Sequence, residues 1–257
     1  MKRVLIASCQ NNLMSNLDII LKHWGYRPLS SPHRDDICGL LEATEPQLVI
    51  FDAPWLREHA ADLEHLVPQM ERRATRLAVL DDCREPLPVL SPELPYRKIP
   101  SDIFSLYGLT QAVLQNHPRR RLRTGVHLPG MFRRDGRQWD LTQILTLGTG
   151  GMFIRSGYRL NRSETVRLCV PLLGMKEELE ALGRVVYEVQ PTPENNYMQG
   201  YGIEFTSLAP ESQQALSRFV AGCFVRELES PMHRNTPPRP AFYNTHNQEY
   251  SLESIAV

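Results

Sequence analysis

A run of arginines, Arg119-Arg120-Arg121-Leu122-Arg123, is the segment of the sequence with the most specific chemistry. The guanidinium group is planar and permanently charged, it forms paired hydrogen bonds to flat acceptors such as guanine O6 and N7, and it stacks on rings. About two dozen residues later, the glycine-rich segment 146–151 leads into the apolar run 152–154. Arginine is thus able to bind anions and flat rings, whereas adjacent arginines outside any motif are more often only solvated charge.

Two further glycine-containing segments, 183–187 (Gly-Arg-Val-Val-Tyr) and 200–205 (Gly-Tyr-Gly-Ile-Glu-Phe), follow in the sequence. In this order and spacing, the pieces between Arg119 and Val220 resemble a PilZ domain, the small β-barrel with which many bacteria sense cyclic di-GMP. The resemblance implies that Arg119 and Arg123 form the spaced arginine pair of a cyclic di-GMP site, with Arg120 beside the first. It implies no other cofactor and no metal.

The second half of the family signature is only partly present. It has an acidic or amide residue, a serine two positions later and a glycine three further on, and this sequence has Thr146, Gly148 and Gly151 there. A threonine hydroxyl is an uncharged acceptor, and the loss of one charge-assisted hydrogen bond costs about 1.5–3 kcal/mol, or roughly 10- to 150-fold in affinity. Gly148 lacks a hydroxyl, although its backbone N–H is able to meet phosphate. The intact arginines favour a receptor, and the altered positions favour a barrel that has lost its ligand.

The elements that would position these residues are short strands separated by turns. We expect strands over 125–132, 138–147, 152–155, 165–171, 182–189 and 200–205, followed by a helix from about Pro210. Such spacing is typical of a small antiparallel β-barrel with a C-terminal helix. We expect Met152, Phe153 and Ile154 in its core, and we favour a core position for Trp139 over a position at the rim. Residues 117–229 are therefore predicted to form this domain.

In the first 116 residues, predicted strands alternate with predicted helices. Strands expected over 4–7, 48–51 and 76–80 are separated by helices from about 13 to 24, 35 to 43, 60 to 71 and 101 to 115. Alternating strands and helices predict an α/β doubly wound parallel sheet with helices on both faces. Asn116-His117-Pro118 marks the boundary, because proline stops the preceding helix.

The strand that ends at Asp52 resembles the phosphoacceptor strand of a response-regulator receiver domain, and Lys98 before Ile99-Pro100 resembles its Lys-Pro pair. In that family two acidic residues after the first strand help to hold Mg²⁺, whereas this sequence has Ser8 and Cys9, which are poor ligands for a hard cation. Asp81 and Asp82 stand where a hydroxyl residue is expected. We therefore predict a receiver-like domain that has lost phosphorylation, in which Asp52 caps the next segment. A working receiver is the weaker alternative.

Composition narrows the function further. Lysine plus arginine and aspartate plus glutamate both total 29, so bulk charge attracts neither nucleic acid nor membrane. We expect a cytoplasmic protein, because the chain begins with a strand pattern rather than a signal peptide and lacks a membrane-spanning run. Its five scattered cysteines indicate reduced thiols and no zinc site. Residues 230–257, with Pro231, Pro237, Pro238 and Pro240, are predicted to be a flexible tail.

The sequence contains no catalytic constellation or phosphate-binding fingerprint, so we expect no enzyme. It also has no recognition-helix motif, so we expect no DNA binding. The first hypothesis is a bacterial effector that responds to cyclic di-GMP through protein contacts in motility, pili or biofilm control, where binding at the linker arginines changes how the domains are disposed. The alternative is a scaffold that binds no nucleotide. Both leave an unidentified protein partner, and homo-oligomers are possible.

Overall fold

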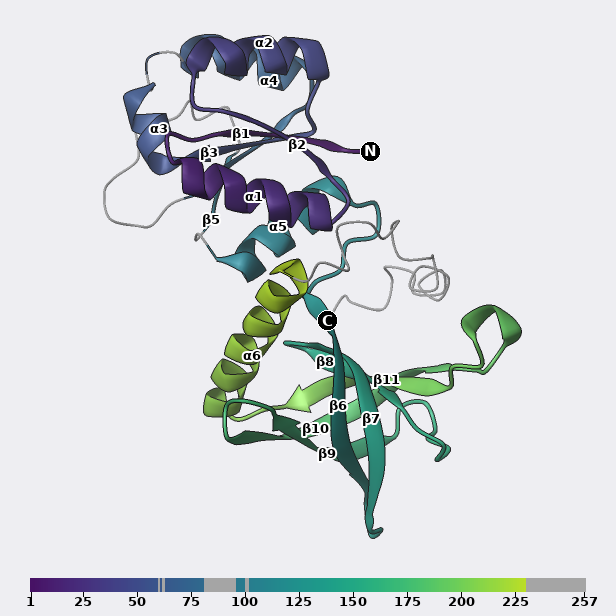
Figure 1. Ribbon diagram of the computed structural model, residues 1–257. Helices are drawn as coiled ribbons and strands as arrows, with labels where there is room; N and C mark the ends of the chain where they lie inside the picture. Colours follow the sequence, from purple (N-terminus) through teal and green to yellow (C-terminus); the bar gives the residue numbers. More distant parts are fainter. Residues whose placement is uncertain (60, 62, 81–95, 100–101, 230–257) are drawn as a thin grey trace. The chain divides into compact units, whose positions relative to one another are not determined.

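The computed structural model describes residues 1–59, 61, 63–80, 96–99 and 102–229. The predicted tail and the pair Asp81-Asp82 lie outside these residues. The chain divides into two compact units, Met1–Leu122 and Arg123–Val257, called unit 1 and unit 2 below. Each unit is described by itself (Figure 1).

Unit 1 is built on a parallel sheet, as predicted. Its strands are β1 (Arg3–Ala7), β2 (Arg27–Ser31), β3 (Leu48–Asp52), β4 (Arg76–Leu80) and β5 (Tyr96–Ile99). Within the described residues they are ordered β2-β1-β3-β4-β5, and every neighbouring pair is parallel. This is the order of flavodoxin-like doubly wound sheets, which present the carboxyl ends of β1 and β3 side by side.

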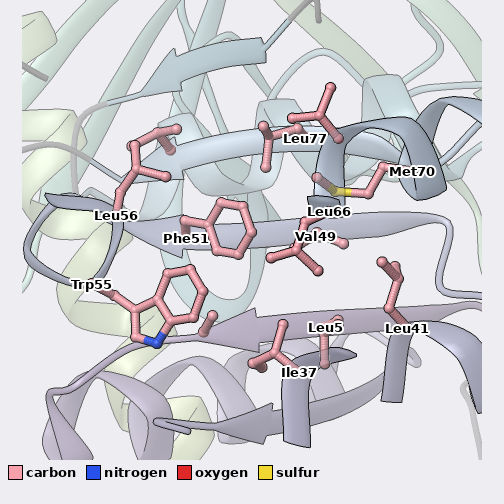
Figure 2. Close-up of a cluster of buried hydrophobic side chains, with 13 residues drawn as sticks. Leu5, Ile37, Leu41, Val49, Phe51, Trp55, Leu56, Leu66, Met70 and Leu77 are labelled. Carbon is pink, nitrogen blue, oxygen red and sulfur yellow. The ribbon is translucent and has the colours of Figure 1, made fainter. Parts of the chain in front are cut away.

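Helices cover both faces of this sheet. They are α1 (Asn11–His23), α2 (Arg34–Thr44), α3 (Ala53–Glu58), α4 (Leu63–Arg72) and α5 (Ile103–Leu114). Successive residues of a strand point to opposite faces, so Leu5 joins a core under α2, α3 and α4, and Ile6 joins a core under α1 and α5. Figure 2 shows the first of these cores, where Phe51 stacks on Trp55 with ring centroids 4.8 Å apart.

Two elements of unit 1 do not follow the sequence pattern. Strand β2 contains a proline and few β-forming residues, and its pairing with β1 from Arg3↔Arg27 to Ala7↔Ser31 places it at the edge of the sheet, where proline is tolerated. The helix expected over about 60–71 is present as α4, but the sequence pattern did not predict α3 before it. The chain forms α3 directly after β3, capped by Asp52, and then begins α4 at Leu63.

Unit 2 is a closed antiparallel barrel with strand order β10-β11-β8-β7-β6-β9, which confirms the predicted fold. The strands are β6 (Arg123–Arg134), β7 (Trp139–Gly148), β8 (Gly151–Arg155), β9 (Thr165–Leu172), β10 (Glu177–Val189) and β11 (Gly200–Ser207). A short 3₁₀ helix, η2 (Pro193–Asn195), connects β10 to β11. Helix α6 (Pro210–Glu229) packs on β6, β7 and β10 through Leu216, Phe219 and Val220, among others (Figure 1).

The barrel core is formed by alternate strand residues. Met152 and Ile154 lie in this core, as expected, whereas Phe153, which is also buried, alternates with them and points to the outer face. The preference for a core position of Trp139 is wrong, since this residue is 41% exposed. It alternates with inward-facing residues of β7 and shares the outer face with Leu141, and the guanidinium carbon of Arg133 lies 5.0 Å from its ring centroid.

Candidate functional site

The register of the barrel brings three of the predicted site residues into one row. Arg123 on β6 lies opposite Gly148 on β7, and Gly148 lies opposite Gly151 on β8. The row continues from Gly151 to Glu204 on β11 and from Glu204 to Arg184 on β10. Directly opposed residues share a face of the sheet, and Arg123, Arg184 and Glu204 are exposed, so this glycine row lies on the outside of the barrel.

A second row runs beside the first on the same outer face. It contains Thr146 on β7, Phe153 on β8, Gly202 on β11 and Tyr187 on β10. The rings of Phe153 and Tyr187 are stacked, with centroids 6.2 Å apart and planes 18° from parallel. This aromatic row and the glycine row together form a surface with few side chains at one end and stacked rings at the other.

Close contacts explain why two of these positions are glycine. A Cβ on Gly151 would overlap the carbonyl oxygen of Ile203 on β11. A Cβ on Gly202 would overlap the ring of Tyr187. Neither glycine has positive φ, so closeness to the neighbouring strand, rather than backbone freedom, excludes a side chain. The predicted turn at Gly150-Gly151 is thus only part of the explanation, because Gly151 already belongs to β8.

The charges on this surface are of both signs. Arg184 and Glu204 form an ion pair at 3.0 Å, and both side chains are more than half exposed. Arg123 is also exposed, and within the described part of the chain no carboxylate pairs with it. The surface therefore has one guanidinium group available to an anion and one carboxylate that opposes an anion.

The arginine motif itself is divided between the two units. Arg119, Arg120 and Arg121 belong to unit 1, and Arg123 begins unit 2. The backbone N–H of Arg119 donates to the side-chain oxygen of Gln111 on α5 at 3.1 Å, and Arg120 is exposed.

Comparison with protein families bears on this surface directly. Residues 115–222 match the model of the family described as PilZ domain. The chain carries a PilZ domain. The match spans the five strands that form the two rows, and it includes Arg119, Arg120 and Arg123. None of the curated proteins matches the chain.

Several solved structures are similar to part of the chain. The inhibitor of motility MotI/DgrA from Bacillus subtilis is 20% identical with a TM-score of 0.37, and the alignment covers 44% of this chain and 53% of that one. The PilZ domain of YcgR from Escherichia coli, solved with c-di-GMP, is 14% identical with a TM-score of 0.35, over 43% and 95% of the two chains. The MrkH–c-di-GMP complex from K. pneumonia is 15% identical with a TM-score of 0.38, over 46% and 56%. The aligned part thus spans about half the length of MotI and MrkH.

The sequence did not indicate every residue on the surface formed by the glycine and aromatic rows, called the PilZ surface below. Glu204 and Tyr187 lie within the segments that carry the resemblance, but their spacing does not indicate that one opposes Gly151 and the other covers Gly202. A β-bulge between Val185 and Tyr187 sets the second contact. Cross-strand register is a tertiary property, so a single sequence offers no direct indication of either pairing.

Unit 1 contains the second predicted polar cluster, at the carboxyl ends of β1 and β3. The hydroxyl of Ser8 donates to Asp52 Oδ2, and the backbone N–H of Trp55 donates to Asp52 Oδ1 at 2.7 Å. Asp52 is 3% exposed and is the N-cap of α3, so the expectation that it caps the next segment is confirmed. Burial raises the pKa of Asp52, against the opposing effect of these two hydrogen bonds.

The other members of this cluster are not suited to metal binding. Desolvation, and then the Glu58 carboxylate 3.4 Å from its sulfur, raise the pKa of Cys9 to about 11, so the thiol stays protonated at neutral pH. Among the described residues, no group of three or more His, Cys, Asp or Glu side chains is arranged to hold a metal ion. Lys98 lies in β5, but its side chain is outside the described part.

Proposed function

We propose that this protein is a cyclic di-GMP-responsive signalling effector whose PilZ domain binds the nucleotide on the outer surface formed by the glycine and aromatic rows. The observation that carries the proposal is the row in which exposed Arg123 stands directly opposite Gly148, which stands opposite Gly151. Glycines leave room for a flat base or a phosphate to approach the strands closely. The guanidinium group beside them offers the paired donors that guanine and phosphate accept.

The remaining ligand contacts would come from Arg119 and Arg120 and from the backbone around Gly148. Thr146 stands where the family has an acidic or amide residue, and it is 8% exposed, so its hydroxyl is a weak and poorly accessible acceptor for a guanine edge. The affinity of the site would therefore depend mainly on its arginines.

The output that we propose is contact with a protein partner in motility, pili or biofilm control, without a catalytic step. A PilZ domain joined to a second folded unit supports this output, since such a chain has a sensing part and another part able to bind elsewhere.

A scaffold that binds no nucleotide is the competing proposal, and one observation favours it. Glu204 lies directly opposite Gly151, and its carboxylate would oppose a phosphate placed over that glycine. The Arg184–Glu204 ion pair at 3.0 Å partly neutralises this charge. The two proposals differ in whether attraction of a phosphate by Arg123 outweighs its repulsion by Glu204.

Titration calorimetry of cyclic di-GMP into the purified full chain, with GTP as the control nucleotide, tests the choice. Saturable binding at low micromolar concentration or tighter, with no heat from GTP, is the expected result. The absence of heat at high concentrations of cyclic di-GMP would make the protein a scaffold.

For unit 1 we propose that Asp52 is not a phosphoacceptor. Both of its oxygens already accept hydrogen bonds, and the positions that would hold Mg²⁺ are Ser8 and Cys9. Incubation with acetyl phosphate and Mg²⁺ should leave the intact mass of the protein unchanged. A stable phosphoryl adduct on Asp52 would instead make unit 1 a working receiver.

A further inference from the structure

The outer face of the β6–β7 hairpin, away from the glycine and aromatic rows, carries exposed apolar side chains. Leu141 on β7 lies opposite Met131 on β6, and Trp139 lies opposite Arg133. Leu141 is 75% exposed and Trp139 is 41% exposed. Two large apolar side chains next to each other on a solvent-facing ladder cost free energy, and such surfaces commonly bind a partner.

Arginines flank this apolar pair on neighbouring strands. Arg155 on β8 lies opposite Gln143 of β7, and Arg167 on β9 lies opposite Arg133 of β6, so they share the outer face. Both side chains are exposed. We call Met131, Arg133, Trp139, Leu141, Arg155 and Arg167 the hairpin patch.

The segment that contains the hairpin patch is strongly positive, whereas Glu178 and Glu180 lie on β10, the strand beyond β9. Residues 129–167 contain seven arginines, two aspartates and one glutamate, which gives a formal net charge of +4 in a chain whose total is zero. Asp140 is paired with Arg134 at 3.2 Å, and Glu164 accepts a hydrogen bond from the backbone of Asn161. Only Asp135, exposed in the turn of the hairpin, adds a negative charge that no described contact engages.

We propose that the hairpin patch binds the surface of a membrane that contains anionic phospholipids. Arginine pairs with phosphate through two parallel hydrogen bonds, and tryptophan prefers the boundary between headgroups and acyl chains. Aliphatic side chains such as Leu141 and Met131 gain from burial in that boundary. The apolar side chains and Arg133 share the outer face of one hairpin, β6–β7, so they approach a surface together, with Arg155 and Arg167 on the strands at either side.

The chemistry of the hairpin patch fits lipid better than single-stranded nucleic acid. Base binding relies on aromatic rings open to stacking, but the Arg133 guanidinium occupies one face of Trp139, and the residues beside it are aliphatic. The proposal concerns adsorption to the surface, since the described residues include no helix long and apolar enough to cross a membrane.

The test is co-sedimentation of the full-length protein with vesicles of phosphatidylcholine, with and without about 30 mol % phosphatidylglycerol. We expect binding only to the anionic vesicles and release at about 0.5 M salt, where surface charges are screened. Trp139 should shift its fluorescence to shorter wavelength on binding, and Trp139→Phe should lose this shift because Trp55 is fully buried and Trp24 belongs to unit 1 rather than to the hairpin patch.

Matched variants separate the hairpin patch from general effects. Arg167→Glu removes one attractive charge and adds a repulsive one, each worth about fivefold, so it should lower the partition coefficient about 25-fold. Arg226→Glu, on exposed α6, makes the same charge change and should leave most of the binding. Leu141→Ser should lower binding about fivefold, whereas Val225→Ser, at an apolar side chain of α6 that is 50% exposed, should not.

Three results would overturn the proposal. The first is equal binding to both vesicle types, and the second is an equal effect of Arg167→Glu and Arg226→Glu. The third is saturable binding of a single-stranded oligothymidylate without vesicle binding, which would assign the hairpin patch to nucleic acid.

Discussion

In unit 1 the Asp52 carboxylate is buried with a hydrogen bond to each oxygen, whereas in the PilZ domain the Arg123 guanidinium is exposed at the end of a row of glycines. Both residues belong to positions that resemble ligand sites of known families. In the first, the side chain already takes part in folding, because it caps α3. In the second, the strands are held by backbone pairing and the side chains remain available.

The difference shows how a resemblance to a functional motif should be tested physically. A polar side chain that satisfies its hydrogen-bonding capacity inside the fold loses those bonds when it binds a ligand, and each costs about 1 kcal/mol. An exposed arginine above glycines has no such cost. On this criterion the PilZ surface is the better candidate site, and the following experiments test the distinction.

The largest effect is expected for Arg123→Ala. Removal of a charge-assisted pair of hydrogen bonds should weaken cyclic di-GMP binding by about 10- to 150-fold, measured by titration calorimetry. The matched control is Arg27→Ala, an exposed arginine on β2 of unit 1 and outside the PilZ match, which should bind like the wild type. Unchanged binding in Arg123→Ala would mean that the two rows are not the site.

Gly151→Val should destabilise the barrel by about 1–3 kcal/mol, because the new side chain would overlap the carbonyl of Ile203 on β11. The measurement is the free energy of unfolding in urea. Gly157 has open space around the position of a Cβ, so Gly157→Val serves as the control and should change stability far less. Equal stabilities would show that β8 and β11 do not approach each other as closely as described.

Asp52→Ala should lower the stability of unit 1 by about 0.5–2 kcal/mol through the lost cap, with a further cost from the unpaired Ser8 hydroxyl. Asp102→Ala removes the N-cap of α5, where Asp102 accepts from two exposed backbone N–H groups, and should cost less. Fluorescence of buried Trp55 reports unfolding. A stable Asp52→Ala variant would weaken the view that this carboxylate serves the fold.

The pH dependence of stability gives a further test of Asp52. Burial raises its pKa, so the folded state holds the proton more tightly than the unfolded state does. The corresponding stability is complete below the ordinary aspartate pKa and is lost as pH rises through the raised value. Asp52→Asn does not titrate, so the stability of the wild type relative to this variant should fall with rising pH, measured in urea from about pH 3 to 7. A rise instead would mean that ionisation of Asp52 favours folding.

The smallest effect is expected for Glu204→Gln. Loss of a carboxylate opposite Gly151 should strengthen cyclic di-GMP binding only about two- to fivefold, because Glu204 is half exposed and already paired with Arg184. Glu211→Gln on α6 is the control. Weaker binding in Glu204→Gln would show that the carboxylate accepts from the ligand rather than opposing it.

The sequence by itself determined both fold classes, because strand and helix periodicities differ and the core residues follow them. Strand β4 lies at the predicted residues, and β8 begins one residue before the predicted start. The sequence did not predict strand β2, because Pro28 and the two serines do not favour a strand. The segment is a strand only because it pairs with β1. The predicted core position of Trp139 was wrong, because tryptophan in a strand usually lies in a core. The alternation of side chains along β7 instead places Trp139 on the outer face.

For the candidate sites, residue types alone indicated Arg123, Gly151 and Asp52, since arginine, glycine and aspartate have distinctive chemistry. Only the tertiary structure decided that Glu204 stands opposite Gly151 and that Asp52 is enclosed by Ser8 and α3. The physical reason is that a contact between distant segments depends on strand register and helix placement. Both are set by packing of the whole domain rather than by the residues that meet.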